Sequence, residues 1–266
     1  MVDQPVDVTR PNAARMYDYM LGGSANFAAD REAAEQMMAT GGTTTAPARL
    51  NRAFLRRAVR FMMEEGVEQF LDLGSGIPTA GNVHEIAQAD NPDARVVYVD
   101  NESVAVHHAK ELLAGNDNAV MIGADLRNVQ SVLAHPDTRR LIDVSKPVGL
   151  LMVAIFHFIP DTDRPAEIVS GYQRALTGGG YLAISHFSDS GLVRAKEAAT
   201  LYRRTATPVI ARTRAEVAAL LAETDLVEPG LVWTPEWRPD GGDPALHAPS
   251  DSRIYAAVGA FPAGSA

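Results

Sequence analysis

Short apolar runs alternate with helix-like stretches through the middle of the chain. Five runs have the length of a buried strand, and the stretches between the first four have the spacing of amphipathic helices. The fourth connection begins with Asp163 as helix N-cap and Pro165 in the first turn. This alternation predicts an α/β fold with a doubly wound, mostly parallel sheet. The predicted strands are 69–73, 95–99, 119–123, 148–155 and 181–185, and the predicted helices are 79–89, 103–114, 129–142 and 163–176.

The start of the chain shows helical patterns only. Glycines follow the first and the third of these patterns, as they often do where a helix ends. We therefore expect an N-terminal helical extension, residues 1–66, in front of an α/β core, residues 67–266, with both parts in one structural domain. The predicted helices of the extension are 12–21, 28–39 and 48–65.

The last third of the chain departs from the alternation. One helix is predicted at 192–204, and a capping box at 213–216 opens another. Two strand-like runs follow, 226–233 and 253–261, and only a polar loop rich in proline and glycine separates them. Because no crossover helix lies between them, we expect the two runs to pair as an antiparallel hairpin at the sheet edge.

Composition narrows the class of protein. The 266 residues are 46% hydrophobic and 21% charged, which is ordinary for a globular protein. A net charge of −9 argues against broad binding to nucleic acid or to anionic membranes. The longest apolar run, 148–156, is too short to cross a bilayer, and the first ten residues lack the apolar segment of a signal peptide. With no cysteine there is no disulfide framework, and we expect a cytoplasmic protein without a metal site.

The most informative stretch is DLGSGIPT, residues 72–79, where the first predicted strand meets its helix. Glycine there lets the backbone turn tightly and brings bare N–H groups to a ligand. A phosphate loop is a poor fit because no Gly-Lys-Ser/Thr follows, and the third glycine of a dinucleotide fingerprint falls on Thr79. The remaining alternatives are the Asp-x-Gly-x-Gly loop of enzymes that use S-adenosylmethionine (SAM) and a turn without a ligand.

Two more carboxylates follow the next two predicted strands. Asp100 ends the second strand, 24 positions after Gly76, where an acidic side chain can accept both ribose hydroxyls of an adenosine-type ligand. Asp125 follows the third strand, where it can accept the adenine amino group while Leu126 supports the ring. Each aspartate alone is more often a turn residue or a helix N-cap. Together with Asp72 they place the right group at three consecutive strand ends.

With these residues and with further segments along its length, the chain resembles the SAM-dependent methyltransferases grouped as the DUF574 family. The resemblance runs over about residues 10–260. The glycine loop is generic to the superfamily, whereas the segment RMYDYMLGG is far more specific. The matching segments are 14–23, 26–31, 51–57, 72–82, 97–101, 124–127, 157–161 and 237–239.

The resemblance implies a Rossmann-like class I methyltransferase with a seven-stranded, mostly parallel sheet, an antiparallel C-terminal hairpin and SAM as cofactor, with S-adenosylhomocysteine (SAH) as product. It also implies that the helices before the first strand fold over the cofactor as a lid. The alternative for the lid residues is that they only bury a helix face. The candidate cofactor-binding residues are Asp72, Gly74, Ser75, Gly76, Thr79, Asp100, Asn101, Asp125 and Leu126, with Arg15, Tyr17 and Asn26 from the lid.

Two histidines follow the fourth and fifth predicted strands, where class I enzymes place residues of methyl transfer. His157 is the first candidate, and His186 faces the same edge of the predicted sheet. A neutral histidine can remove a proton from an acceptor hydroxyl or amine as the methyl group arrives. Because methyl transfer depends largely on holding the nucleophile in line, such a base is optional, and a structural histidine is the alternative for both.

Three functions stay open at this stage. The first is a methyltransferase that acts on a small-molecule acceptor, with O-methylation favoured over N-methylation. The second is a protein that senses SAM or SAH without turnover, because no Asn/Asp-Pro-Pro-Tyr motif follows the fourth strand. The third is a nicotinamide oxidoreductase, which the absence of a Tyr-x-x-x-Lys pair disfavours. A homodimer is an open alternative to a monomer.

Overall fold

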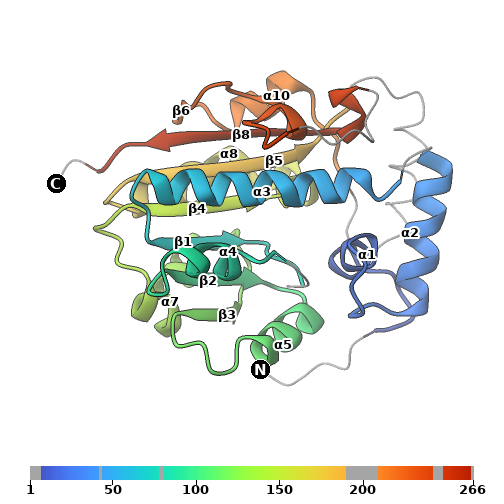
Figure 1. Cartoon of the computed structure of the whole chain (residues 1–266), viewed down its shortest axis with the longest axis horizontal. Helices are drawn as coiled ribbons and strands as arrows, with labels where there is room; N and C mark the ends of the chain where they lie inside the picture. Colours follow the sequence, from blue (N-terminus) through green and yellow to red (C-terminus); the bar gives the residue numbers. More distant parts are fainter. Residues whose placement is uncertain (1–6, 42–43, 78–80, 190–208, 242–247, 265–266) are drawn as a thin grey trace.

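The computed structural model describes residues 7–41, 44–77, 81–189, 209–241 and 248–264. A central sheet runs through the molecule in the order β3-β2-β1-β4-β5-β8-β6, with β7 beside β8 (Figure 1). The predicted alternation of strands and helices is confirmed, and the first five strands are parallel to one another. They are β1 (Gln69–Leu73), β2 (Arg95–Asp100), β3 (Ala119–Gly123), β4 (Val148–Val153) and β5 (Gly180–Phe187).

The C-terminal part adds antiparallel strands, as expected. The long strand β8 (Ile254–Phe261) pairs with β5 along its whole length. The predicted run 226–233 is not one strand, because it is split into β6 (Asp225–Leu226) and β7 (Val232–Trp233), which both pair with β8. The sheet therefore has eight strands instead of the seven expected.

Helices cover both faces of this sheet. On one side lie α3 (Ala46–Glu64), α4 (Val83–Asp90) and α5 (Ser103–Leu112). On the other lie α6 (Val129–Ala134), α7 (Pro136–Leu141), α8 (Pro165–Ala175) and α10 (Arg214–Ala219). The predicted helix 129–142 is two helices, because Pro136 starts a new first turn. The predicted helix 192–204 lies outside the described residues.

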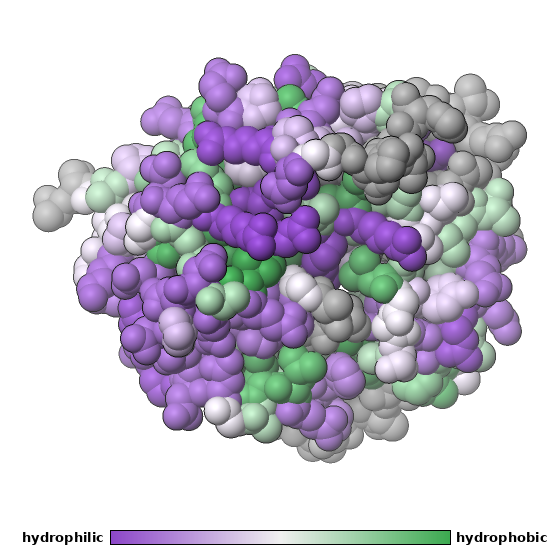
Figure 2. All heavy atoms as spheres, in the orientation of Figure 1, coloured by the Kyte–Doolittle hydropathy of each residue, from purple (hydrophilic) through white to green (hydrophobic). Residues whose placement is uncertain are grey.

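The sequence pattern of β1 explains the three layers. All five of its residues are buried, because successive side chains point to opposite faces and both faces are covered. Phe70 packs with the residues of α3 and α4, whereas Leu71 and Leu73 pack with those of α8. Figure 2 shows mostly hydrophilic residues on one outer face, with hydrophobic ones in small groups.

Two further helices, α1 (Ala13–Met20) and α2 (Ala28–Gly41), lie beyond the carboxyl ends of the parallel strands (Figure 1). They pack on each other through an apolar cluster of their own, built around Met16, Met20 and Ala34. Ala48 at the start of α3 joins this cluster and connects it with the rest of the molecule. Among the described residues, no helix has the length and hydropathy needed to span a membrane.

Short 3-10 turns complete the described chain. The turn η1 follows β4 directly and carries one of the predicted site residues, so its position matters most for the site. The turns are η1 (Phe156–Phe158), η2 (Asp161–Asp163), η3 (Thr234–Glu236) and η4 (Pro249–Ser252).

Candidate functional site

A cavity of about 340 Å³ lies between the carboxyl ends of the parallel strands and the N-terminal helices. The strand ends contribute the glycine loop and the carboxylates, and α1, α2 and α3 contribute the opposite wall. The sequence predicts ten of the residues that line it: Tyr17, Asp72, Gly74, Ser75, Gly76, Asp100, Asn101, Asp125, Leu126 and His157. Of the other four, Arg15, Asn26 and His186 lie outside its lining, and Thr79 lies outside the described residues.

The glycine loop turns in a conformation that favours glycine. Gly74 and Gly76 have φ angles of +72° and +64°, in the left-handed region. A Cβ atom on Gly74 would lie 2.3 Å from Cγ1 of Ile155, so the loop also packs closely on the turn after β4. The Gly76 N–H donates to Oδ2 of Asp100 at 2.8 Å, which ties the loop to the end of β2.

Asp100 is held in place by the backbone on both of its oxygens. Besides Gly76, the N–H of Glu102 donates to Oδ1 at 2.9 Å. Burial raises the pKa of the Asp100 carboxyl, and the backbone N–H groups oppose this effect. The carboxylate is therefore fixed at the rim of the cavity, and each oxygen keeps a lone pair for a further donor.

Asp72 is the most perturbed carboxyl group in the cavity. It is 6% exposed, and burial raises its pKa to about 7. The positive charge of Arg52 lowers this pKa, and the nearby charge of Asp100 raises it. A carboxylate held in this way is stabilised by a cation, so the site favours a ligand that brings positive charge to Asp72.

Asp125 differs from the other two carboxylates because an arginine binds it. Nε of Arg127 donates to both of its oxygens at 2.9 Å, and Nη1 of Arg127 reaches Oδ2 of Asp163 at 2.6 Å. The hydrogen bond from Arg127 lowers the pKa of Asp125. Next to it, the Leu126 carbonyl accepts the Tyr172 hydroxyl at 2.8 Å, which fixes this corner of the cavity.

Tyr17 brings α1 into the wall of the cavity. Its hydroxyl donates to the carbonyl of Ala48 at 3.1 Å and accepts from Nδ2 of Asn51 at 3.0 Å. Asn51 is buried and accepts in turn from the Ser185 hydroxyl at 2.6 Å. A chain of hydrogen bonds therefore joins α1, α3 and the end of β5, and it holds the Tyr17 ring against the cavity.

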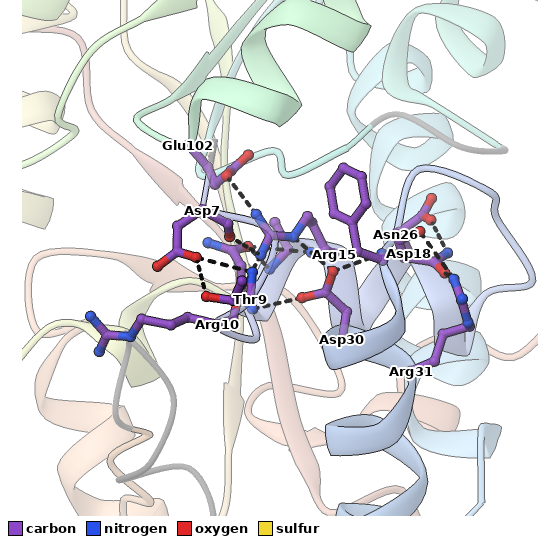
Figure 3. A network of polar contacts seen from close by, with 12 residues as sticks. Asp7, Thr9, Arg10, Arg15, Asp18, Asn26, Asp30, Arg31 and Glu102 are labelled. Carbon is purple, nitrogen blue, oxygen red and sulfur yellow. Dashed lines mark hydrogen bonds and ion pairs between the residues drawn. The ribbon is translucent and has the colours of Figure 1, made fainter. Parts of the chain in front are cut away.

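Arg15 is bound by other residues of the protein (Figure 3) and is not among the residues that line the cavity. Its Nε donates to Oδ2 of Asp30 at 2.8 Å, and its Nη1 lies 3.4 Å from Oε1 of Glu102. Asn26, another residue of the predicted lid that was expected to bind the cofactor, donates to Oδ2 of Asp18 at 2.7 Å (Figure 3). These contacts with neighbouring side chains give both residues a role in holding the N-terminal helices together.

The two histidines have different surroundings. His157 lines the cavity in η1, and the N–H of Phe187 points to its Nδ1 at 3.4 Å. His186 is fully buried, with its Nδ1 2.7 Å from the carbonyl of Phe187 and its Nε2 2.7 Å from Nη1 of Arg212. Burial lowers the pKa of His186 to about 4 and that of His157 well below 6.5. Both rings are therefore neutral near pH 7.

Sequence reasoning missed Asn51 and Arg52, which both line the cavity. A signal for them exists in the pattern of α3. Helical neighbours lie three and four positions apart, and Leu55 and Ala58, which follow at that spacing, are buried. Two polar residues therefore interrupt the apolar face of this helix, and such an interruption indicates a buried polar site.

Comparisons with known proteins identify the family. The model of the S-adenosyl methyltransferase family matches residues 1–262. A protein of known structure from Thermobifida fusca YX, which carries a provisional methyltransferase name, is 39% identical, covers 99% of this chain and 100% of its own, and has a TM-score of 0.90. A DUF574 family protein from Streptomyces avermitilis MA-4680 is 35% identical over 96% of this chain and 99% of its own, with a TM-score of 0.91. A search among curated proteins found no match.

A more distant structure shares the fold. The N-methyltransferase NodS from Bradyrhizobium japonicum WM9, in complex with SAH, is 11% identical over 81% of this chain and 88% of its own, with a TM-score of 0.50. The resemblance noted in the sequence is thus confirmed by the match along almost the whole chain and by two structures at 35–39% identity. The chain belongs to the S-adenosyl methyltransferase family, and its cofactor is S-adenosylmethionine.

Proposed function

We propose that this protein transfers the methyl group of SAM to an oxygen atom of a small-molecule acceptor. One observation carries the proposal. A single cavity joins the carboxylates at the ends of β1, β2 and β3 on one side to His157 and apolar side chains on the other. The first half suits a cofactor with a ribose and an adenine, and the second suits an uncharged organic acceptor.

The residues of the cofactor half fit SAM in their chemistry. Asp100, fixed by two backbone N–H groups, offers its free lone pairs to the ribose hydroxyls. Leu126 supplies an apolar surface for the adenine, beside the carboxylate of Asp125. The left-handed backbone at Gly74 and Gly76 lets the loop approach a ligand without side chains between them. When bound, SAM supplies an electrophilic methyl carbon on a sulfonium.

The acceptor half lies where β4 and β5 end, where β8 begins, and where α1 and α2 cover this edge of the sheet. Its apolar members include Met20, Met37, Phe158 and Ile254. Apolar walls exclude water and hold the acceptor by its surface, and positioning of the nucleophile in line is the main requirement of methyl transfer. We assign the N-terminal helices the role of a lid over this half.

His157 is the residue of this half that we assign to the acceptor. The Phe187 N–H directed at Nδ1 favours the tautomer with the proton on Nε2. The neutral ring then donates a hydrogen bond to the acceptor oxygen and orients its lone pair. His186 acts behind it as a positioning residue, because it contacts Arg212 rather than the cavity. The turn after β4 has the sequence Ala-Ile-Phe-His, without the Asn/Asp-Pro-Pro-Tyr motif of amino-group methylases, which favours oxygen over nitrogen.

One other function has an observation in its favour. A protein that senses SAM or SAH without turnover needs no base, and the low pKa values of the two histidines leave no strong base among them. An oxidoreductase that uses NAD is disfavoured, because the loop lacks the third glycine of the dinucleotide fingerprint.

Calorimetric titration with SAM, SAH and NAD in parallel is the first test. We expect SAM and SAH to bind and NAD not to bind. A mass-spectrometric screen of hydroxylated aromatic and aliphatic compounds with SAM then separates transfer from sensing. Binding of NAD alone would contradict the proposal, and SAM binding without transfer to any acceptor class would favour the sensor.

A further inference from the structure

Arg52 is a cation in the cavity that forms no ion pair with any residue that the structure describes. It lies in the second turn of α3 and lines the cavity, with its guanidinium carbon 6.0 Å from the centre of the Tyr17 ring. Its Nε is buried and has no hydrogen-bond partner among the described residues. A buried guanidinium N–H without a partner is costly, so a group that accepts from Arg52 stabilises the site.

Other arginines of this region do not share this property. Arg127, which also lines the cavity, is bound by Asp125 and Asp163. Arg57, on the same helix as Arg52, donates to the carbonyls of Thr234 and Trp237 at 2.7 and 2.8 Å. Of these three arginines, Arg52 is the one that has no ion pair within the described part of the chain and whose Nε lacks a hydrogen-bond partner there, so its charge is left for a ligand.

Asp72 supplies the opposite charge in the same cavity. The two side chains interact electrostatically, because Arg52 lowers the pKa of Asp72. They are nevertheless not among the ion pairs with an N–O distance of 4.0 Å or less in the described part of the chain. A cation and an anion that share a cavity without direct contact leave room for a molecule that carries both charges between them.

We propose that Arg52 and Asp72 together bind the amino-acid group of the cofactor, with Arg52 on its carboxylate and Asp72 on its ammonium. The inference rests on the proposed function. In this arrangement Arg52 and Asp72 select ligands that carry an ammonium and a carboxylate at one end. A guanidinium suits this task because its planar fork of N–H donors matches the two oxygens of a carboxylate. The Tyr17 ring beside Arg52 limits the directions in which the guanidinium can turn.

Two ligands test this assignment against each other. SAH carries the amino-acid group, whereas 5′-deoxy-5′-methylthioadenosine has the same adenosine and thioether without it. We expect Arg52→Gln to weaken SAH binding by about 10- to 100-fold, as for the loss of a charge-assisted hydrogen bond, and to change methylthioadenosine binding by less than about threefold. Calorimetry on the full chain measures both dissociation constants.

The matched control is Arg56→Gln on the outer side of the same helix. The Arg56 side chain is 47% exposed and pairs with Asp240 at 3.2 Å. Its replacement should therefore leave the affinities for SAH and for methylthioadenosine unchanged. Asp72→Asn should repeat the pattern of Arg52→Gln, and Arg52→Lys should recover part of the lost SAH affinity. Circular dichroism and the melting temperature show whether each variant is folded.

The possible results separate the inference from the proposed function. If Arg52→Gln weakens both ligands equally, or neither, Arg52 does not bind the amino-acid group and this inference is wrong while the cofactor assignment stands. If the unsubstituted protein binds neither SAM nor SAH, the proposed function fails and the inference fails with it. Selective loss of SAH in both charge-removing variants supports the pair.

Discussion

At the scale of single residues, Asp72 shows a conflict between stability and binding. Its pKa is about 7 in the folded protein, because burial disfavours the charge, against 3.8 for an ordinary aspartate. A raised pKa of an acid means that stability falls as the pH rises from about 4 through 7. Asp72→Asn should therefore raise the free energy of unfolding at pH 8, by up to about 4 kcal/mol, and much less at pH 4.5.

Urea denaturation at the two pH values measures this difference. Asp93→Asn, an exposed aspartate before β2, is the control and should change stability little at either pH. The same Asp72 variant should bind SAH more weakly, so that stability is gained where binding is lost. A stability gain of equal size at both pH values would show that the charge of Asp72 is not its cause.

Asp100 gives the second prediction at this scale. Asp100→Ala removes a carboxylate that accepts from the backbone N–H groups of Gly76 and Glu102 and that we assign to the ribose. Affinity for both SAH and methylthioadenosine should fall by about 10- to 100-fold, because both ligands carry the ribose. Calorimetry measures the affinities, and unchanged values for either ligand would remove Asp100 from the site.

The histidines predict an unusual response to pH. Because burial lowers the pKa of His157 well below 6.5 and that of His186 to about 4, neither ring gains a proton between pH 6 and 8. The ring-proton resonances of both residues should therefore stay constant across this range in NMR spectra of the folded protein. Assignment through His157→Gln and His186→Gln identifies them, and a titration of either signal near pH 6.5 would contradict the burial argument.

At the scale of elements, Arg212 fixes the turn that carries His157. This buried residue precedes α10 and donates to the carbonyls of Phe156 and Ile159, both at 2.9 Å. It also reaches Oδ1 of Asp161 at 2.6 Å. One guanidinium therefore contacts three residues of the segment between β4 and α8 and ties this segment to the start of α10.

Replacing this guanidinium should loosen the turn. Arg212→Gln leaves buried carbonyl groups without donors, and we expect a loss of about 2–4 kcal/mol in the free energy of unfolding. Since the cofactor half depends on other elements, SAH affinity should change by less than about threefold. The exposed Arg174, which pairs with Glu223, supplies the control variant Arg174→Gln. Thermal melts and calorimetry check the two expectations, and a large loss of SAH affinity would show that the halves are not independent.

The elements could largely be predicted from sequence because buried parallel strands appear as continuous apolar runs. The carboxylates of the cofactor half were predictable for a related reason, since parallel strands bring their carboxyl ends to one edge of the sheet. The split of 226–233 was missed because Pro229 and Gly230 stand inside an otherwise strand-like run. Both residues are typical of turns and weaken a strand, so the signal was present.

The side chains of the N-terminal helices could not be placed in the same way. Arg15 and Asn26 belong to the N-terminal segment that contributes to the cavity wall. The directions of their side chains depend on how α1 and α2 pack, which no local sequence pattern specifies. Asp30 and Asp18 are buried, and each buried carboxylate needs a hydrogen-bond donor. Arg15 therefore turns to Asp30, and Asn26 turns to Asp18. Arg52 was missed because helix periodicity was used only to find the apolar face.

At the scale of the whole molecule, we expect α1 and α2 to form a unit that opens separately from the sheet. Their apolar cluster is distinct from the two clusters on the faces of the sheet. Arg15 bridges the unit to the core, because it binds Asp30 of α2 and reaches Glu102 at the N-terminus of α5 (Figure 3). A region with few apolar contacts to the core opens at a lower free energy than the core itself.

The Arg15–Glu102 ion pair should therefore control this opening. Its side chains are only 3% and 13% exposed, so water screens the attraction little. Without the Glu102 charge, Arg15 keeps Asp30 of α2 as a partner but loses its charged contact with α5. Glu102→Gln should raise the hydrogen-exchange rates of amides in α1 and α2 by about 10-fold, and leave those of β1 and β4 unchanged. The matched control is Glu111→Gln on α5. Glu111 is exposed, and its Oε1 lies 3.5 Å from Nε2 of His107.

Hydrogen exchange of the free protein, followed by mass spectrometry, separates local from global effects. If exchange in the strands rises together with that in α1 and α2, the ion pair stabilises the whole fold and no separate unit exists. If only the N-terminal helices respond, the dissociation rate of SAH should rise in the same variant, because the same helices cover the cavity that we assign to the ligand. The hydrogen-exchange rate of α1 and α2 and the dissociation rate of SAH should then rise together in Glu102→Gln and in Arg15→Gln. Such a parallel change is expected when ligand release requires α1 and α2 to open.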